Sequence, residues 1–236
     1  MPRAIFFDMD DTLLDAVNAN VIAWETVCAE VAPRLGCDAE KLRTTIRKEG
    51  GAFWKDEAAV GHWRVDLEGA RALVIEKALN LLELETSPAK RMAADYSCVH
   101  REHLKPFDDA FETLDAVRAS GKNVGLITNG PTALQRDKIE RFGLQPYMDV
   151  IVIEGEFGRG KPDPAVFQHA LKSVGVNAAE AWHVGDNLYA DIGGAQGVGM
   201  QGVWIHRDRL KLQDDAPARP DRTIAHLTEI RTVIAG

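Results

Sequence analysis

The sequence contains few cysteines, no excess of positive charge and no long apolar run. Three cysteines, Cys28, Cys37 and Cys98, occur among 236 residues, and none belongs to a CxxC pair. An odd number of widely spaced cysteines argues against a disulfide framework and is typical of isolated thiols in a reducing compartment. Because no stretch approaches the roughly 18 consecutive apolar residues of a membrane-spanning helix, we expect no membrane partner.

The formal net charge of -8 argues against general nucleic-acid binding, which needs a basic face. This net charge is compatible with a small anionic substrate, because cations and a bound metal close to the substrate can outweigh the field of the distant negative charges. The N-terminus, MPRAIFFDMDD, lacks the apolar core of a signal peptide because aspartates interrupt it. We therefore expect a cytoplasmic protein without a nucleic-acid partner, as a monomer or a homodimer.

Short apolar runs alternate with helical patterns over much of the chain. The expected strands are 4–7, 122–128, 149–153, 181–185 and 202–205, and the expected helices between and after them are 108–120, 131–143, 163–174, 188–198 and 224–234. Runs that are apolar throughout are typical of strands covered on both faces. Strand and helix in alternation predict a parallel sheet with right-handed crossovers.

The interval from Asp15 to Lys105 contains no convincing strand. Its segments 16–32, 38–50, 67–84 and 87–104 have amphipathic helical patterns. The sequence therefore predicts an α/β protein with a three-layer, Rossmann-like parallel-sheet core, formed by residues 1–14 and 106–236. An inserted helical cap domain is predicted at residues 15–105.

Polar side chains follow four of the predicted strands, at the point where each strand ends. They are Asp8 and Asp10, then Thr128 and Asn129, then Lys161, and finally Asp186 and Asp191. Ligands bind at the carboxyl ends of strands in open parallel sheets, so these groups are expected at one edge. Several carboxylates that face one point favour a hard divalent cation such as Mg²⁺. A carboxylate can also attack phosphorus, while a lysine and a hydroxyl hold the phosphoryl oxygens.

Each of these features also has a purely structural interpretation. Asp10 and Asp186 could merely cap the helices that follow them, and Lys161 could lie in a surface turn. An Asp-rich calcium loop is excluded, because Leu13 and Ala19 stand where such a loop needs glycine and a bidentate acid. Four coincidences at successive strand ends favour the functional interpretation.

The four motifs resemble those of the haloacid dehalogenase superfamily, in the phosphatase branch that carries a helical cap after the first strand. The matching segments, in order, are DMDDT, LITNG, GKPDP and VGDNLYAD. The stretch LITNGPTALQRDKIERFGL is also similar to the N-acylneuraminate-9-phosphatase-like group. The resemblance covers residues 4 to about 206. The family usually has glycine where Asp11 stands, and we assign no chemistry to that residue.

The resemblance implies a role for each matching residue. Asp8 would be the nucleophile and a Mg²⁺ ligand, and Asp10 would be the general acid and base, with its backbone carbonyl on the metal. Thr128, Asn129 and Lys161 would bind or orient the phosphoryl group. Lys161 would also be a catalytic residue. Asp186 would bind the metal directly, and Asp191 would be a metal ligand through water or a residue that supports the other ligands.

The middle of the predicted cap contains an irregular segment, GGAFWKDEAAVGHWR, in which aromatic residues alternate with cations. In caps of this type such a segment selects the leaving group, so Trp54, Lys55 and Arg64 are candidate specificity residues. Ordinary packing of the cap is the alternative.

The sequence thus predicts a Mg²⁺-dependent phosphohydrolase that acts on a small phosphorylated metabolite through an aspartyl-phosphate intermediate. A phosphomutase of the same superfamily, a 2-haloacid dehalogenase and a non-catalytic member are the alternatives. Asp10 disfavours the dehalogenase, because the metal-free dehalogenases lack the second aspartate of the first motif. A non-catalytic member would be expected to have lost one of the four principal polar residues, Asp8, Asp10, Lys161 or Asp186, and all are present.

Overall fold

The computed structural model describes residues 1–55, 63, 66–207, 212–213 and 215–234. Two compact units emerge from the contacts between residues. One unit combines Met1–Asp15 with Pro106–Gly236 and contains a sheet, whereas the other, Ala16–Lys105, is helical in its described part.

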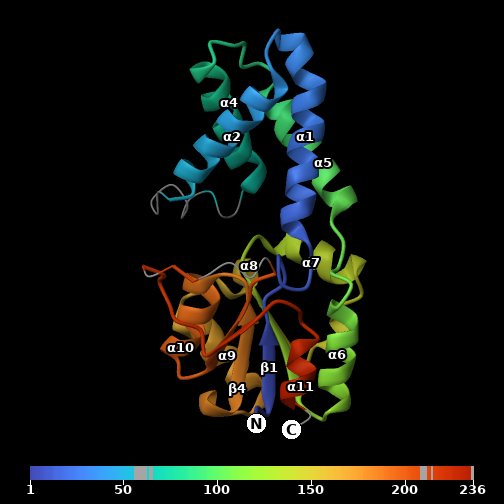
Figure 1. The fold of residues 1–236 in the computed structure, drawn as a ribbon, viewed down its shortest axis with the longest axis vertical. Helices are drawn as coiled ribbons and strands as arrows, with labels where there is room; N and C mark the ends of the chain where they lie inside the picture. Colours follow the sequence, from blue (N-terminus) through green and yellow to red (C-terminus); the bar gives the residue numbers. More distant parts are fainter. Residues whose placement is uncertain (56–62, 64–65, 208–211, 214, 235–236) are drawn as a thin grey trace. The chain divides into compact units, whose positions relative to one another are not determined.

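A six-stranded sheet forms the centre of the first unit, and Figure 1 shows β1 and β4 side by side within it. The strands are β1 (Ala4–Phe7), β2 (Asn123–Thr128), β3 (Val150–Ile153), β4 (Ala181–Gly185), β5 (Gln201–Ile205) and β6 (Arg222–Ile224). Their spatial order is β3-β2-β1-β4-β5-β6, and every neighbouring pair is parallel. The predicted α/β fold with a Rossmann-like parallel sheet is confirmed.

The sheet is buried on both faces, as the apolar strands predict. All four residues of β1 are buried, including Ile5 and Phe6 on opposite faces. Helix α9 (Pro164–Val174) contributes Val166 and Phe167 to the buried cluster that also contains Phe6. Helix α6 (Ala110–Ala119) contacts β2 and packs against α11 (Glu229–Ile234) (Figure 1).

The remaining elements of this unit are short helices and turns beside the strands. They are α7 (Thr132–Arg141), the 3-10 turn η1 (Gln145–Tyr147), α8 (Glu154–Phe157), the 3-10 turn η2 (Ala178–Glu180), the π-helical turn η3 (Leu188–Gly193) and α10 (Gly194–Gly197).

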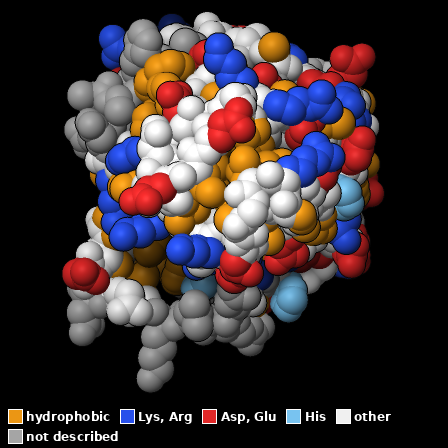
Figure 2. Space-filling view, turned by 90° about the horizontal axis from the view of Figure 1, so that it is seen from above, with side chains coloured by type: hydrophobic (Ala, Val, Ile, Leu, Met, Phe, Trp, Pro, Cys, Tyr) orange, Lys and Arg blue, Asp and Glu red, His pale blue; other side chains and the backbone are white. Residues whose placement is uncertain are grey.

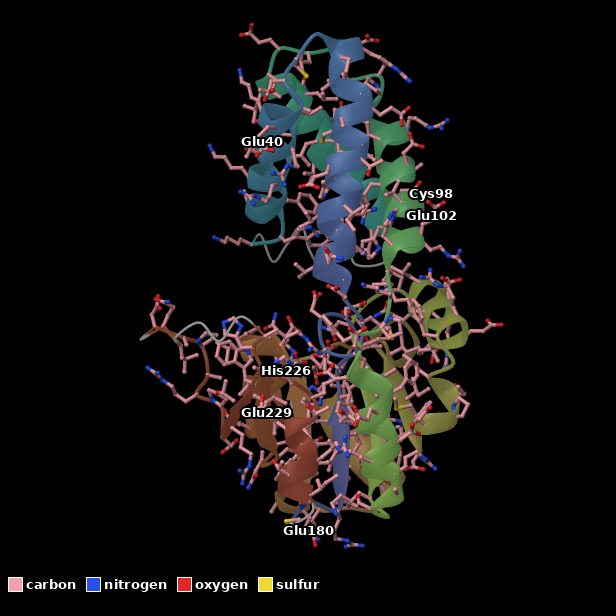
Figure 3. The ribbon with its side chains drawn as sticks, turned by 45° about the vertical axis from the view of Figure 1, so that its right-hand side comes forward. Glu40, Cys98, Glu102, Glu180, His226 and Glu229 are labelled. Atoms are coloured by element: carbon pink, nitrogen blue, oxygen red, sulfur yellow. The ribbon has the colours of Figure 1, made fainter. Side chains whose placement is uncertain are left out.

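Two details near the C-terminal end differ from the sequence-based expectation. The segment 188–198 is not one regular α-helix, because η3 takes π-helical geometry before α10. Strand β6 was not predicted, since a three-residue run with two exposed residues has no apolar pattern. Helix α11 consequently begins only at Glu229, whose side chain accepts hydrogen bonds from the backbone of Ala225 and His226 (Figure 3).

The two segments that lead out of and back into the first unit lie side by side. Leu14 and Pro106 form an antiparallel bridge, and Phe107 N donates to Leu13 O at 3.0 Å. Arg207 reinforces this junction, because its guanidinium stacks on the Phe107 ring at 3.5 Å and pairs with Asp109 at 3.1 Å. The segment that follows β1 is thus anchored to the start of the later core segment.

In its described part, the second unit contains the long helices α1 (Ala16–Leu35), α2 (Ala39–Phe53), α4 (Leu67–Leu81) and α5 (Ala89–His103). Each packs against two others, in the pairs α1 with α2, α2 with α4, α4 with α5, and α5 with α1. Their shared core includes Leu42, Ile75, Leu79 and Met92, all fully buried. Asp38 caps α2 by accepting from Lys41 N at 2.8 Å.

The surface of the described chain mixes charges of both signs. On the face drawn in Figure 2, Lys and Arg side chains lie among Asp and Glu side chains. In the part of the chain that the structure describes, no helix is both long and apolar enough to cross a membrane.

All three cysteines are free thiols, as expected for a chain without a disulfide framework. Burial raises the pKa of the Cys28 thiol to about 12. Cys98 is exposed on α5, 3.6 Å from Glu102 Oε1 (Figure 3).

The close approach of β2 to its neighbours generates a prediction about stability. A Cβ atom at Gly125 would lie 2.4 Å from Phe6 Cδ1 and 2.9 Å from Val150 Cγ1. We therefore expect Gly125→Ala to lower the free energy of unfolding by about 1–3 kcal/mol in urea titrations, as overpacking does. Gly197→Ala is the matched control, because nothing lies within 4 Å of its Cβ position. Equal stability of the two variants would contradict the close packing around Gly125.

Candidate active site

The strand order brings the ends of β1 and β4 together at one edge of the sheet. The chain runs outward from β1 through β2 to β3 and then returns to β4 on the other side of β1. A crevice forms outside the carboxyl ends of strands at such a reversal point. Asp8 follows β1 directly, and its backbone N–H donates to Val184 O of β4 at 2.9 Å.

The buried ammonium group of Lys161 joins two of these strand ends. Its Nζ lies 2.5 Å from Asp8 Oδ1 and 2.6 Å from Asp191 Oδ1. The exposed side-chain fractions are 3% for Lys161, 11% for Asp8 and 2% for Asp191. This group is therefore a nearly dry ion triad, and charge-assisted hydrogen bonds of this kind are strong.

Local backbone features hold Asp191 in this position. It lies in η3, and π-helical turns are frequent at functional sites. Its Oδ2 accepts from Asn187 N at 3.0 Å, while Asn187 caps the turn by accepting from Tyr189 N and Ala190 N. A Cβ at Gly185 would lie 2.3 Å from Asp191 Cγ, so the carboxylate needs glycine at the end of β4.

Asn129 holds the backbone of Lys161. Its Nδ2 donates to Lys161 O at 2.9 Å, and its Oδ1 accepts from Lys161 N at 2.7 Å. The side chain at the end of β2 therefore fixes the loop after β3, which also needs Gly160 because a Cβ there would lie 2.8 Å from Asn129 Oδ1. Both polar atoms of the Asn129 amide are hydrogen-bonded to the Lys161 backbone, so Asn129 is a residue that positions Lys161.

Two side chains of α7 hold the Asp10 carboxylate. Lys138 Nζ lies 2.8 Å from Oδ1 and 2.7 Å from Oδ2, and Gln135 Nε2 donates to Oδ2 at 3.1 Å. Gln135 Nε2 also lies 2.6 Å from Thr128 Oγ1. Gln135 and Lys138 are buried although their side chains are polar, and Ile139 is buried beside them in the sequence of α7. Asp10 is thus bound to α7, while Asp8 is bound to Lys161.

The charges of the triad shift its pKa values in opposite directions. Burial raises the pKa of the Asp8 carboxyl well above its usual range, and the carboxylates of Asp191 and Asp186 add to the rise against the opposing effect of Lys161. Burial alone would also raise the pKa of Asp191, but Lys161 and His183 lower it strongly. For Lys161, the attraction of both carboxylates outweighs burial and raises the pKa.

Asp8, Asp186 and Asp191 each offer an oxygen atom, and these atoms lie within 4.8 Å of one another. Asp186 is exposed at the rim, yet desolvation by the surrounding protein, together with Asp191 and Asp11, raises its pKa to about 7. Three carboxylates face one ammonium group, so two negative charges stay uncompensated when all are ionised. An oxygen-only set with this excess charge fits a hard divalent cation.

Asp11 has a conformation that explains its position in the loop. Its φ is +61°, in the left-handed region that aspartate tolerates better than most residues with a Cβ atom. Asp11 therefore fits the turn that the family usually forms with glycine.

Of the three candidate specificity residues, two are described. Trp54 and Lys55 lie at the end of α2, in the helical unit, and the Trp54 ring contacts Phe53 at a centroid distance of 5.2 Å. Arg64 lies outside the described residues.

Sequence reasoning missed three residues of this site: Gln135, Lys138 and His183. His183 lies within β4 and is fully buried, and its Nε2 lies 3.0 Å from Asp191 Oδ1. Burial lowers the pKa of His183, so its neutral ring donates to the Asp191 carboxylate. Their spacing of three residues places Gln135 and Lys138 on one face of the helix after LITNG, but nothing in the sequence indicates that this face is turned toward Asp10.

Comparison with known proteins assigns the family. Residues 2–199 match the family model described as haloacid dehalogenase-like hydrolase. A curated relative from Thermus thermophilus, named phosphoserine phosphatase, is 31% identical over 97% of this chain and 97% of its own. The chain belongs to the haloacid dehalogenase-like hydrolases, as its four motifs predicted.

Solved structures of both reaction classes share the fold. A HAD phosphatase from Thermococcus onnurineus is 27% identical, with a TM-score of 0.67 over 100% of this chain and 99% of that one. A 2-haloacid dehalogenase from Pseudomonas syringae is 28% identical, with a TM-score of 0.65 over the same shares. The fold is therefore common to phosphatases and dehalogenases, and the choice between them depends on the site residues.

The ion triad predicts a large effect of removing its ammonium group. We expect Lys161→Met to destabilise the metal-free protein by about 3–5 kcal/mol at pH 7.5, because Asp8 and Asp191 lose their buried partner. The loss should shrink toward pH 5, because burial without the ammonium group raises the pKa of both carboxyls, so that they take up protons as the pH falls.

Urea unfolding at both pH values measures this effect. Arg136→Met is the matched control, because Arg136 pairs with Glu156 at 2.6 Å on the surface, and exposed pairs contribute less than about 1 kcal/mol. A Lys161→Met protein as stable as the Arg136→Met protein at pH 7.5 would show that the triad is not formed.

Proposed function

We propose that this protein is a Mg²⁺-dependent phosphohydrolase that cleaves a small phosphate monoester through a phosphorylated Asp8. The observation that carries the proposal is the contact of Lys161 with both Asp8 and Asp191, beside Asp186, at the end of β1. The enzymes similar to this chain include phosphatases of small phosphorylated metabolites, such as the one named for phosphoserine. That similarity supports a substrate of the same kind.

In the first step, an Asp8 oxygen attacks phosphorus and the bond from phosphorus to the ester oxygen breaks. Asp10 supplies the proton that the leaving oxygen needs. Lys161 and the Thr128 hydroxyl hold the phosphoryl oxygens as negative charge spreads over them. A divalent cation bound by the carboxylates would neutralise charge on the phosphoryl oxygens and favour the ionised form of Asp8.

In the second step, water attacks phosphorus and the bond to the Asp8 oxygen breaks. Asp10 takes up the proton of that water, which restores its starting form and releases phosphate. Lys138 and Gln135 are positioning residues in this scheme, because they contact Asp10 and not the reacting atoms. They fix the orientation of the carboxylate that must reach first the ester oxygen and then water.

The position of Asp10 favours a phosphatase over a dehalogenase, because the halide that leaves in a dehalogenase needs no proton. An aspartate that Gln135 and Lys138 hold in the loop after the nucleophile has a use in phosphoryl transfer, where the ester oxygen must be protonated. A phosphomutase would use the same residues and pass the phosphoryl group to a second hydroxyl. Release of free phosphate in proportion to substrate consumed distinguishes hydrolysis from that transfer.

The covalent step predicts the outcome of one substitution. We expect Asp8→Asn to lower kcat for p-nitrophenyl phosphate at least about a thousandfold, because the amide cannot form the acyl phosphate. Asp11→Asn is the matched control three positions away: asparagine tolerates the left-handed conformation, so kcat should stay within about threefold. Near-normal turnover of purified Asp8→Asn would remove the covalent mechanism.

The carboxylate group predicts stabilisation by metal. Saturating MgCl₂ at 100 times its Kd would stabilise the protein by about 2.7 kcal/mol. For a protein of this size the melting temperature would rise by roughly 5–10 °C. The apparent affinity should be about tenfold lower at pH 6 than at pH 8, because Asp186 has a pKa of about 7 and must lose its proton to bind metal.

Differential scanning fluorimetry with MgCl₂ titrations at both pH values measures this effect. Asp186→Asn should abolish most of the rise in melting temperature, whereas Asp115→Asn, at an exposed position of α6, should keep it. A rise that is the same at pH 6 and pH 8 and persists in Asp186→Asn would place the metal elsewhere.

A further inference from the structure

His183 is a buried residue with ionisable chemistry that the proposed mechanism does not use. It occupies the middle of β4 and is fully buried. Side chains alternate between the two faces of a strand, so His183 and Gly185 face the side of the sheet on which Asp191 lies. His183 Nε2 lies 3.0 Å from Asp191 Oδ1, the same oxygen that Lys161 contacts.

The surroundings of the imidazole ring decide which of its nitrogen atoms carries a proton. Nδ1 is buried, and among the described residues it has no hydrogen-bond partner. The Phe167 ring lies at 89° to the imidazole, at a centroid distance of 5.3 Å, and adds an apolar wall. A proton on Nδ1 would therefore be a buried donor without an acceptor. With Nδ1 unprotonated, Nε2 carries the proton and donates to Asp191 Oδ1.

Asp191 consequently receives hydrogen bonds on both oxygens of its carboxylate. Oδ1 accepts from Lys161 Nζ at 2.6 Å and from His183 Nε2 at 3.0 Å, and Oδ2 accepts from Asn187 N at 3.0 Å. Donors on both oxygens fix the plane of the carboxylate, because a rotation about its Cβ–Cγ bond would break them. Without His183, Oδ1 would have Lys161 as its partner and no second donor to hold it.

The orientation of the Lys161 ammonium group depends on this carboxylate. An ammonium group has three N–H donors, and among the described residues two of them are used by Asp8 Oδ1 and Asp191 Oδ1. The third N–H is left for a phosphoryl oxygen. Its direction follows from the two carboxylates, since their contacts fix the rotation of the ammonium group.

We propose that His183 is a positioning residue, whose Nε2–H holds the Asp191 carboxylate so that Lys161 keeps one N–H directed at the phosphoryl group. This inference rests on the proposed phosphatase function, because the phosphoryl group is the partner of that N–H. His183 contacts none of the reacting atoms in this role, and its proton stays on Nε2 throughout.

Two replacements of His183 that differ in one polar group test this role. The Nε2 atoms of glutamine and histidine are the same number of bonds from Cβ, so His183→Gln keeps a donor for Asp191. His183→Met is the matched control, because methionine resembles glutamine in length and has no N–H. Both variants lose the ring that packs against Phe167, so the difference between them reports the hydrogen bond.

Steady-state hydrolysis of p-nitrophenyl phosphate with MgCl₂ measures the effect. We expect kcat of His183→Met to be roughly 10- to 100-fold below that of His183→Gln, because a small misplacement of a catalytic group has consequences of this size. The ratio kcat/KM should fall by the same factor, since Lys161 acts on charge that develops in the transition state. Urea unfolding checks that both variants are folded in the assay. Equal kcat values of the two folded variants would overturn the proposal.

The contact itself is tested without turnover. Long-range ¹H–¹⁵N correlation NMR of the unmodified protein in EDTA shows which nitrogen atom of each histidine ring carries a proton. We expect the His183 ring to be neutral, with its proton on Nε2. A proton on Nδ1 would overturn the proposal whatever the kinetics show. This measurement needs no variant, so it still decides if His183→Met or His183→Gln fails to fold.

Failure of the proposed function and failure of the role of His183 give different results. Turnover by the unmodified protein, with equal kcat values in the two variants, would refute the role of His183 alone. Absence of turnover by the unmodified protein would refute the proposed function, and the role of His183 would fall with it. The proton on Nε2 would then still establish the hydrogen bond to Asp191.

Discussion

The contact of the Lys161 ammonium group with Asp8 and Asp191 is the interaction on which the rest of the site depends. Two buried carboxylates in one small space repel each other, and each is costly to remove from water. The buried Lys161 ammonium group offsets this cost, because its Nζ lies 2.5 Å from Asp8 Oδ1 and 2.6 Å from Asp191 Oδ1. Two negative charges stay uncompensated once Asp186 is ionised as well, which suits a divalent cation.

Much of the surrounding structure fixes the place of this cation. Asn129 holds the Lys161 backbone from the end of β2, and Asn187 and His183 hold Asp191 from the side of β4. Gly160 and Gly185 are required because a Cβ atom at either would collide with these polar groups. The parallel sheet contributes the common edge at which segments from distant parts of the sequence meet.

The fold class could be predicted from the sequence, because buried parallel strands are short apolar runs with a strong signal. The sixth strand, Arg222–Ile224, could not, since its first two residues are exposed and its pairing with β5 depends on tertiary context. The positions of Asp8, Lys161 and Asp191 follow from motifs at strand ends, but the partners of Asp10 do not. Gln135 and Lys138 look like ordinary surface residues of a polar helix until the structure shows them buried against the site.

The proposed mechanism requires that Asp8 itself accepts the phosphoryl group. Borohydride reduces an acyl phosphate to an alcohol, so an aspartyl phosphate trapped during turnover becomes homoserine. Mass spectrometry of the peptides from such a reaction tests the claim most directly. With Asp8 as the nucleophile, homoserine is expected at position 8, and only in the presence of both substrate and Mg²⁺. Turnover in which no aspartate is converted to homoserine, or in which homoserine appears at another aspartate, would contradict a phosphorylated Asp8.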